Sequence, residues 1–179
     1  MIAIGREISP STVQAYHQGE IRTLVLEELR GKWLVLMFYP GDFTFVCPTE
    51  LAELARLYPE FVTLGAEVCG VSTDSVYVHK AWHDSSPMVR TVEFPLIADS
   101  TGALSREFGV YLEEEGVALR GTFLIDPDGV LRAYEVHDNS IGRYIGETLR
   151  KLQAAIRVRE GEGEACPANW QPGQPTLTP

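Results

Sequence analysis

The sequence feature that most constrains the fold is a run of seven apolar residues from Trp33 to Tyr39. A continuous apolar run of this length is typical of a central β-strand that is covered on both faces. The chain leaves the run through Pro40 and Gly41, and a helical pattern with Pro48 at its first position follows. Apolar residues then recur at three- and four-residue spacing as far as Phe61. The run therefore predicts a buried strand that leads through a short loop into an amphipathic helix.

Other segments extend this α/β pattern along the chain. Residues 11–17 and 20–26 alternate loosely around Gly19 and predict an N-terminal β-hairpin. The further predicted elements are a strand over 67–72, a helix capped by Asp74 and running through Trp82, a strand over 95–98, a helix capped by Asp99 or Ser100 and running toward Phe108, a hairpin over 121–126 and 130–136, and a last helix at about 142–159. This is the thioredoxin-like layout, a central mixed β-sheet flanked by helices, although the pattern alone leaves other α/β topologies open.

Length and composition indicate one soluble domain. The chain has 179 residues, of which 45% are hydrophobic and 22% are charged, and it is long enough to bury a full core. Its last twenty residues are rich in Gly, Glu and Pro, a composition typical of a mobile terminus. We therefore expect a domain over residues 1–159 and a C-terminal tail over residues 160–179.

Charge and hydropathy argue against two classes of function. The formal net charge of −10 disfavours nucleic-acid binding, because such proteins need clustered Lys and Arg. No apolar stretch approaches the roughly 20 residues that span a bilayer. Residues 1–10 do not resemble a secretory signal. We expect a cytoplasmic protein without nucleic-acid or membrane partners.

Cys47 stands where the predicted loop enters the predicted helix. Free backbone N–H groups and the positive end of the helix dipole favour an anion at such a position. A thiolate is an anion, and it is the nucleophilic form of cysteine. The position therefore predicts a reactive thiol at Cys47.

The other two cysteines lie in different settings. Cys69 lies inside an apolar strand-like run, where a free cysteine usually behaves as a small buried hydrophobic residue. Cys166 lies in the Gly- and Pro-rich tail, which by its composition is mobile and accessible to a partner. Three cysteines of this kind do not indicate a structural disulfide framework.

Two patterns resemble metal sites without completing one. His79 and His83 are spaced i, i+4, but no third ligand in an HExxH arrangement accompanies them. Residues 126–129 resemble the opening of a calcium loop but lack its closing Glu, and they predict a hairpin turn. We expect no metal and no other cofactor.

Cys47 also lies in a recognisable motif. Pro40, Thr44 and Cys47 form the pattern Pro-x-x-x-Thr-x-x-Cys, which resembles the active-site motif of the peroxiredoxins. Five further stretches look, in the same order, like the peroxidase subunit of bacterial alkyl hydroperoxide reductase, a typical 2-Cys peroxiredoxin: residues 46–50, 71–74, 79–84, 120–129 and 166–170. The resemblance covers nearly the whole chain. It implies a thioredoxin-like fold and a thiol-dependent peroxidase of antioxidant defence and redox homeostasis, which reduces hydrogen peroxide and alkyl hydroperoxides.

The resemblance also implies roles for both outer cysteines. Cys47 corresponds to the family's peroxide-reactive cysteine, which becomes a sulfenic acid. Cys166 corresponds to the resolving cysteine, which then forms a disulfide with Cys47 of another subunit. Since two Cα atoms beyond about 7 Å cannot be bridged without movement, we expect the first turn of the Cys47 helix and the tail to unwind during the cycle.

The same resemblance implies three further catalytic residues, Thr44, Arg120 and Pro40, and two supporting ones, Glu50 and Arg143. Thr44 and Arg120 match the residues that stabilise the departing peroxide oxygen, and Pro40 matches the one that shields the sulfur. Glu50 matches the residue that holds a guanidinium, and Arg143 matches the family's second arginine. Residues 85–95 lack the Gly-Gly-Leu-Gly insertion of peroxide-sensitive members, so we expect resistance to inactivation by excess peroxide.

The partners and two alternative functions stay open at this point. The resemblance implies a homodimer, a decamer of five dimers, and a disulfide reductase that could be thioredoxin, a flavoprotein or a similar dithiol protein. A general thiol–disulfide oxidoreductase would need a Cys-x-x-Cys motif, but Pro48, Thr49 and Glu50 follow Cys47. A chaperone or redox relay would show peroxide-dependent changes in oligomer size, and no sequence patch points to it.

Overall fold

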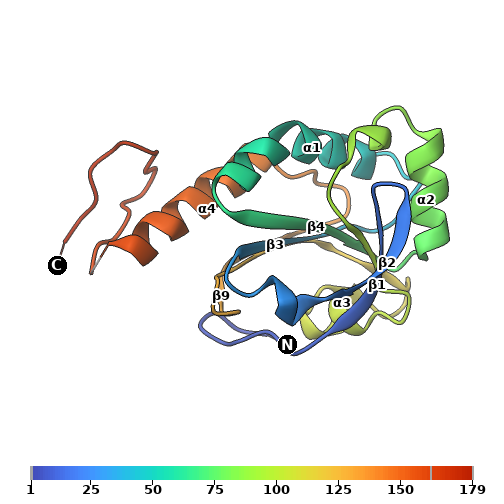
Figure 1. The fold of residues 1–179 in the computed structure, drawn as a ribbon, viewed down its shortest axis with the longest axis horizontal. Coiled ribbons are helices and arrows are strands. Elements are labelled where there is room, and N and C mark those ends of the chain that lie inside the picture. Colours follow the sequence, from blue (N-terminus) through green and yellow to red (C-terminus); the bar gives the residue numbers. More distant parts are fainter. Residues whose placement is uncertain (1, 162, 179) are drawn as a thin grey trace. The chain divides into compact units, whose positions relative to one another are not determined.

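The computed structural model describes residues 2–161 and 163–178 (Figure 1). The chain forms two compact units, residues 1–143 and 144–179, which are described separately below. The boundary between these units falls before the last helix. No helix among the described residues is both long and apolar enough to cross a membrane.

The first unit is built on a mixed seven-stranded sheet, with the strand order β2-β1-β5-β4-β3-β8-β9. β3 pairs in parallel with β4 and antiparallel with β8, and β1 forms the predicted antiparallel hairpin with β2. A separate two-stranded sheet pairs β6 with β7. The strands are β1 (Thr12–His17), β2 (Glu20–Val25), β3 (Trp33–Phe38), β4 (Ala66–Ser72), β5 (Leu96–Ala98), β6 (Tyr111–Leu112), β7 (Val117–Ala118), β8 (Arg120–Ile125) and β9 (Leu131–His137).

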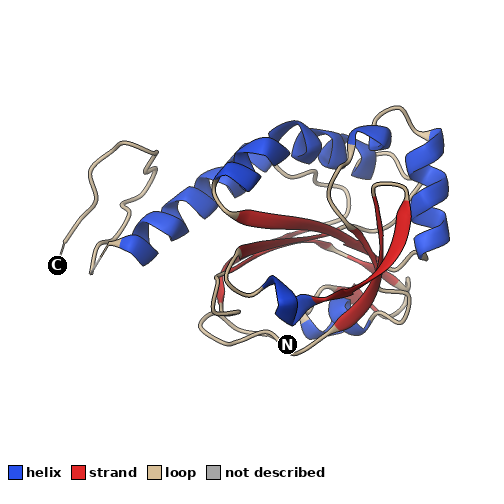
Figure 2. Cartoon of the chain, viewed as in Figure 1, coloured by secondary structure: helices blue, strands red, loops and turns tan. Residues whose placement is uncertain are grey.

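Helices cover both faces of this sheet (Figures 1 and 2). α1 (Cys47–Thr63) and α2 (Val76–Ser85) lie on one face, and α3 (Ala103–Glu107) lies on the other. β3, β4 and β5 lie side by side in the sheet, and α1 and α2 connect them in turn. Since β-α-β crossovers are right-handed, two consecutive crossovers in the same direction place α1 and α2 on the same face. Two short 3-10 helices, Leu26–Leu29 and Val89–Thr91, complete the unit. The expected thioredoxin-like sheet with flanking helices is thus confirmed.

Every residue of β3 is buried, as the apolar run predicted. Successive side chains of a strand point to opposite faces, so Leu34, Leu36 and Phe38 join the core on the α3 side. In that core Phe108 and Phe123 stack edge to face with a ring separation of 4.7 Å. The remaining β3 side chains face α1, whose Leu51, Leu54 and Phe61 are fully buried.

Two predicted helix caps differ from the observed ones. Ser75, and not Asp74, caps α2, since its hydroxyl accepts a hydrogen bond from Val78 N. The Asp74 carboxylate instead accepts the backbone N–H of Asp42 at 2.8 Å, a contact that draws it away from the helix.

The start of α3 shows a second difference. Its cap residue is Gly102, at φ +69°, a conformation that glycine adopts without steric cost. Asp99 lies three residues before the cap, yet its carboxylate still accepts hydrogen bonds from the N–H groups of Leu104 and Ser105. Asp99 therefore accepts hydrogen bonds from the first N–H groups of α3, as a capping residue would, but the cap position itself is Gly102.

The second unit contains α4 (Ile145–Glu160) and a folded tail. α4 begins three residues later than predicted, because the backbone N–H of Arg143 is engaged by Glu50 outside any helix. After α4 the tail doubles back, and Ala165 and Leu177 form an isolated antiparallel bridge with two hydrogen bonds of 2.8 Å. Glu164 accepts a hydrogen bond from Thr176 and pairs with Arg157.

Candidate active site

Cys47 is the first residue of α1, and its side chain is fully buried. The loop of residues 40–46, which we call the active-site loop, carries the chain to it from the end of β3. Pro48 follows as the second helical residue, where its missing N–H costs no helical hydrogen bond. Val46 occupies the cap position, and no described side chain caps the helix. The positive end of α1 is therefore available to an anion at Cys47.

Arg120 approaches Cys47 from the neighbouring strand. Because β8 runs antiparallel to β3, the first residue of β8 lies beside the carboxyl end of β3. The Arg120 Nη1 donates to Cys47 Sγ at 3.3 Å and to Glu50 Oε2 at 2.9 Å. Its Nε and Nη2 donate to the Asn139 carbonyl at 3.0 and 2.8 Å. The guanidinium is thus buried and held on two sides.

Glu50 lies one helical turn beyond Cys47 and joins the two arginines. Its Oε1 accepts the backbone N–H of Arg143 at 2.8 Å and the Arg143 Nε at 2.9 Å. Its Oε2 accepts Arg143 Nη2 at 2.7 Å in addition to Arg120. Arg143 also donates to the Gly121 carbonyl and to the Thr122 hydroxyl. The structure therefore brings four of the predicted site residues into one buried cluster.

The charges in this cluster favour a thiolate. Burial alone would raise the pKa of Glu50, but the hydrogen bonds and charge of Arg143, together with the charge of Arg120, outweigh it, so this pKa lies below its ordinary value. Glu50 is then an anion between two cations, and the three side chains carry a net charge of about +1. Ionised Cys47 brings the cluster to neutrality. In a buried site this balance matters, because an uncompensated charge is costly.

The remaining residues of the motif border this cluster without such dense contacts. Thr44 donates its hydroxyl proton to the Gly41 carbonyl at 2.8 Å. The role predicted for Thr44, which is to stabilise the departing peroxide oxygen, stays a prediction. Pro40 is partly buried at the start of the active-site loop.

The other two cysteines lie in different settings, and Cys69 is buried as the sequence predicted. Cys69 is fully buried on β4, and burial, with a smaller contribution from Glu67, raises the pKa of its thiol far above the ordinary value. Cys166 belongs to the second unit, where it is partly exposed and its sulfur lies 3.8 Å from the Ala154 carbonyl. None of the three forms a disulfide.

His79 and His83 take part in separate hydrogen-bond networks. His83 contacts the Tyr16 hydroxyl and the Val92 carbonyl, while His79 contacts the Asp42 carboxylate and the Ile97 carbonyl. Within residues 2–161 and 163–178, no group of three or more His, Cys, Asp or Glu side chains is placed to hold a metal ion.

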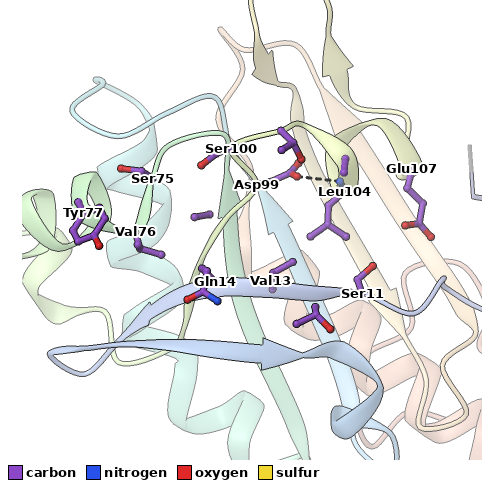
Figure 3. A pocket seen from close by; sticks show the side chains of 14 residues that line it. Ser11, Val13, Gln14, Ser75, Val76, Tyr77, Asp99, Ser100, Leu104 and Glu107 are labelled. Carbon is purple, nitrogen blue, oxygen red and sulfur yellow. Dashed lines mark hydrogen bonds between the residues drawn. The ribbon is translucent and has the colours of Figure 1, made fainter.

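A pocket of about 510 Å³ lies apart from this cluster (Figure 3). It is bounded by β1, the start of α2 and α3, with Gln14, Val76 and Leu104 among its lining residues. Asp99 also lines it, but its carboxylate is already occupied by the N–H groups of α3. The Cys47 cluster therefore lies outside this pocket, at the start of α1.

Sequence reasoning missed two parts of the site. The Asn139 carbonyl fixes the Arg120 guanidinium, but a backbone carbonyl has no signature in the sequence. Asp42, in the active-site loop, and His79, on α2, form a buried pair. Asp42 lies inside the motif itself, so a polar residue between the apolar strand and Cys47 was the available signal.

The chain is similar in sequence to known proteins over its whole length. Residues 4–134 match the AhpC/TSA family, and residues 155–179 match the C-terminal domain of 1-Cys peroxiredoxin. Alkyl hydroperoxide reductase C of Pseudomonas aeruginosa is 49% identical over 179 residues, covering 100% of this chain and 96% of the relative. A selenocysteine-containing peroxiredoxin, PrxU, of Peptoclostridium acidaminophilum is 48% identical over 183 residues, covering 100% of this chain and 90% of the relative.

Solved structures extend the likeness to three dimensions. The crystal structure of Enterococcus faecalis AhpC superposes with a TM-score of 0.90 at 41% identity, covering 93% of this chain and 100% of that one. The reduced 2-Cys peroxiredoxin of Plasmodium vivax superposes with a TM-score of 0.91 at 32% identity, covering 97% and 91%. The chain therefore belongs to the AhpC/TSA family of peroxiredoxins.

Proposed function

We propose that the chain, as a thiol-dependent peroxidase, reduces hydrogen peroxide and alkyl hydroperoxides to water and alcohols with Cys47 as its nucleophile. The observation that carries this proposal is the 3.3 Å contact between Arg120 Nη1 and Cys47 Sγ, inside a cluster that a thiolate brings to neutrality. The family membership of the whole chain supports the same chemistry.

In the first step the Cys47 thiolate attacks one peroxide oxygen. An S–O bond forms, the O–O bond breaks, and its electron pair leaves with the distal oxygen, which takes a proton to become water or an alcohol. Cys47 is thereby oxidised to sulfenic acid. Arg120 can donate to the oxygen on which charge develops, and removing one such donor costs about 10²- to 10³-fold in rate. Glu50 and Arg143 act as positioning residues, because they hold that guanidinium.

In the second step Cys166 resolves the sulfenic acid. The Cys166 sulfur attacks the Cys47 sulfur, hydroxide leaves and is protonated to water, and a disulfide joins the two residues. Because Cys47 is fully buried as the first residue of α1, its sulfur becomes accessible when the first turn unwinds. The Ala165–Leu177 bridge opens in the same step to release the Cys166 segment. A reductase of the thioredoxin, flavoprotein or similar dithiol class then restores both thiols in the cytoplasm.

Edge strand β9 supports a homodimer in which this disulfide joins two subunits. β9 lies at the end of the seven-stranded sheet, and its Tyr134 and Val136 are 53% and 39% exposed. An edge strand with exposed apolar side chains is a template for pairing with another strand. The exposed aromatic side chains of Phe43, Phe45 and Tyr77 offer a second surface, which supports assembly of five dimers into a decamer.

Peroxide consumption with dithiothreitol as the reductant tests the nucleophile. Cys47→Ser should abolish consumption, since no thiolate remains at the cluster. Cys69→Ser is the matched control, because its thiol is equally buried but has a raised pKa and no arginine contact. Activity retained in the Cys47 variant would overturn the assignment.

A further inference from the structure

Three buried side chains connect the active-site loop to the sheet and to α2. The Tyr39 hydroxyl donates to Asp42 Oδ1 at 2.9 Å. Asp42 Oδ2 lies 2.7 Å from His79 Nδ1, and His79 Nε2 lies 3.1 Å from the Ile97 carbonyl. The side chains of Asp42 and His79 are fully buried. The contacts described for Cys47 include none of these groups, so the peroxidase step proposed above does not explain the network.

A proton inventory shows how the network is satisfied. The Ile97 carbonyl can only accept, so His79 Nε2 carries a proton. One further proton lies between Nδ1 and Oδ2, which makes the pair either imidazolium with carboxylate or imidazole with carboxylic acid. Both forms are neutral overall and leave every polar atom paired. Burial raises the pKa of Asp42, although the hydrogen bond and the charge of His79 oppose this shift.

Tyr39 and Asp74 are the other titratable groups that face this pair. Burial, with Asp42 beside it, raises the pKa of Tyr39 well above its ordinary value, so its hydroxyl stays a donor. The Asp74 carboxylate accepts the backbone N–H of Asp42 at 2.8 Å. Asp42 is thus held through its side chain by Tyr39, which directly follows β3, and by His79 of α2, and through its backbone by the segment after β4.

The loop that Asp42 anchors is held in a strained conformation. Phe43, the next residue, has φ +55°, a left-handed value that a bulky side chain rarely adopts. Its ring packs on Trp82 with a centroid separation of 6.0 Å. Such strain persists only where the surroundings fix the backbone, and here the anchors lie on both sides of Phe43 at Asp42 and Thr44.

We propose that Asp42 and His79 are positioning residues for the peroxide reaction, which hold the active-site loop so that Cys47 and the loop groups that face the peroxide keep their reactive geometry. The proposal rests on the proposed role of Cys47. Displacing reacting groups by about 1 Å costs on the order of 10²-fold in rate, so loss of the anchor should be visible in the chemical step.

The test compares Asp42→Ala with Asp42→Asn in the full chain. The Asn oxygen can accept from Tyr39, and its NH₂ group can donate to Nδ1 of a neutral His79, which restores every hydrogen bond without a charge. The readouts are the rate constant for oxidation of Cys47 by hydrogen peroxide and the melting temperature. We expect Asp42→Ala to be folded and slower by about 10²-fold, with Asp42→Asn close to the wild-type rate.

Asp126→Asn is the matched control. This carboxylate is also fully buried, but it lies after the end of β8 that is opposite Arg120. Asp126→Asn should lower the melting temperature and leave the oxidation rate unchanged. If Asp42→Ala does not fold, Tyr39→Phe removes one hydrogen bond and keeps the ring, and it should slow oxidation by about five-fold.

Two results would overturn the proposal. One is a folded Asp42→Ala protein, or a Tyr39→Phe protein, that reacts at the wild-type rate. The other is an Asp42→Asn protein as slow as Asp42→Ala, because hydrogen-bond geometry would then not be what matters. Failure of the proposed function is a different result, since wild-type Cys47 would then show no oxidation by peroxide at all.

Discussion

Replacing Arg120 by Met tests how the buried cluster activates Cys47. The substitution keeps much of the side-chain volume but removes the charge and four hydrogen bonds, to Cys47, to Glu50 and twice to the Asn139 carbonyl. With Arg120 absent, Glu50 and Arg143 neutralise each other, so that ionised Cys47 becomes an uncompensated buried anion.

The expected loss has two parts. Removal of a transition-state donor should slow the reaction of Cys47 with hydrogen peroxide by about 10²- to 10³-fold, or about 2.7–4 kcal/mol. Breaking a buried ion pair typically costs about 3–5 kcal/mol of stability, and we expect the lower end of that range. The reason is that Glu50 keeps three hydrogen bonds from Arg143, so its carboxylate does not become unpaired.

Stopped-flow measurement of Cys47 oxidation, with scanning calorimetry of the same samples, separates the two parts. Arg120→Lys should lie between wild type and Arg120→Met, because an ammonium retains the charge but cannot fork toward Glu50 and Asn139 together. A folded Arg120→Met protein that reacts at the wild-type rate would refute the activating role of the cluster.

Three further predictions follow from the same contacts. The pKa of Glu50 is lowered in the folded chain, since Arg143 and Arg120 outweigh the effect of burial. The ionised carboxylate therefore stabilises the fold fully above its unfolded pKa of about 4.5. This stabilisation is lost as the pH falls through the lower pKa of the folded chain. Calorimetry should therefore show a melting-temperature gap between wild type and Glu50→Gln that is full at neutral pH and narrows below about pH 4.5, and a constant gap would contradict this. Iodoacetamide should leave Cys69 unmodified in the folded chain, because its thiol is buried with a raised pKa, and mass spectrometry that finds it alkylated as fast as Cys47 would be inconsistent with the structure. At low peroxide Cys47 should pass from sulfenic acid to disulfide without accumulating sulfinic acid, and sulfinic acid after a few turnovers would show that resolution is slow.

Much of the fold was predictable because its centre is encoded locally. The run from Trp33 to Tyr39 is apolar without interruption, and the structure buries the corresponding strand on both faces. The hairpin around Gly19 and the amphipathic pattern of α1 follow from equally local signals. The cap of α2 was not predictable, because the Asp74 carboxylate accepts a hydrogen bond from the backbone N–H of Asp42. The two residues lie 32 positions apart in the sequence.

The site shows the same division. The resemblance to the family directed attention to Arg120 and Glu50, which the structure brings together at 2.9 Å. The carbonyl that fixes Arg120 and the pair of Asp42 with His79 depend on how separate strands and helices meet, which no local pattern encodes.

Composition did not predict how the tail is held. The structure closes it with the Ala165–Leu177 bridge and the hydrogen bond between Thr176 and Glu164, contacts that depend on a few particular side chains and backbone groups. The mobility of the tail stays a prediction, and the contacts that close the segment around Cys166 have no signal in its composition.

The central claim, that Cys47 reacts and Cys166 resolves, is tested most directly by one equivalent of hydrogen peroxide. Intact mass and non-reducing gel mobility would be measured for wild type, Cys47→Ser and Cys166→Ser. The predicted result is a disulfide-linked dimer in wild type alone, with a sulfenic acid trapped on Cys47 in the Cys166→Ser protein. A disulfide-linked dimer that still forms in Cys47→Ser would contradict the account, because the reactive thiol would then be another cysteine.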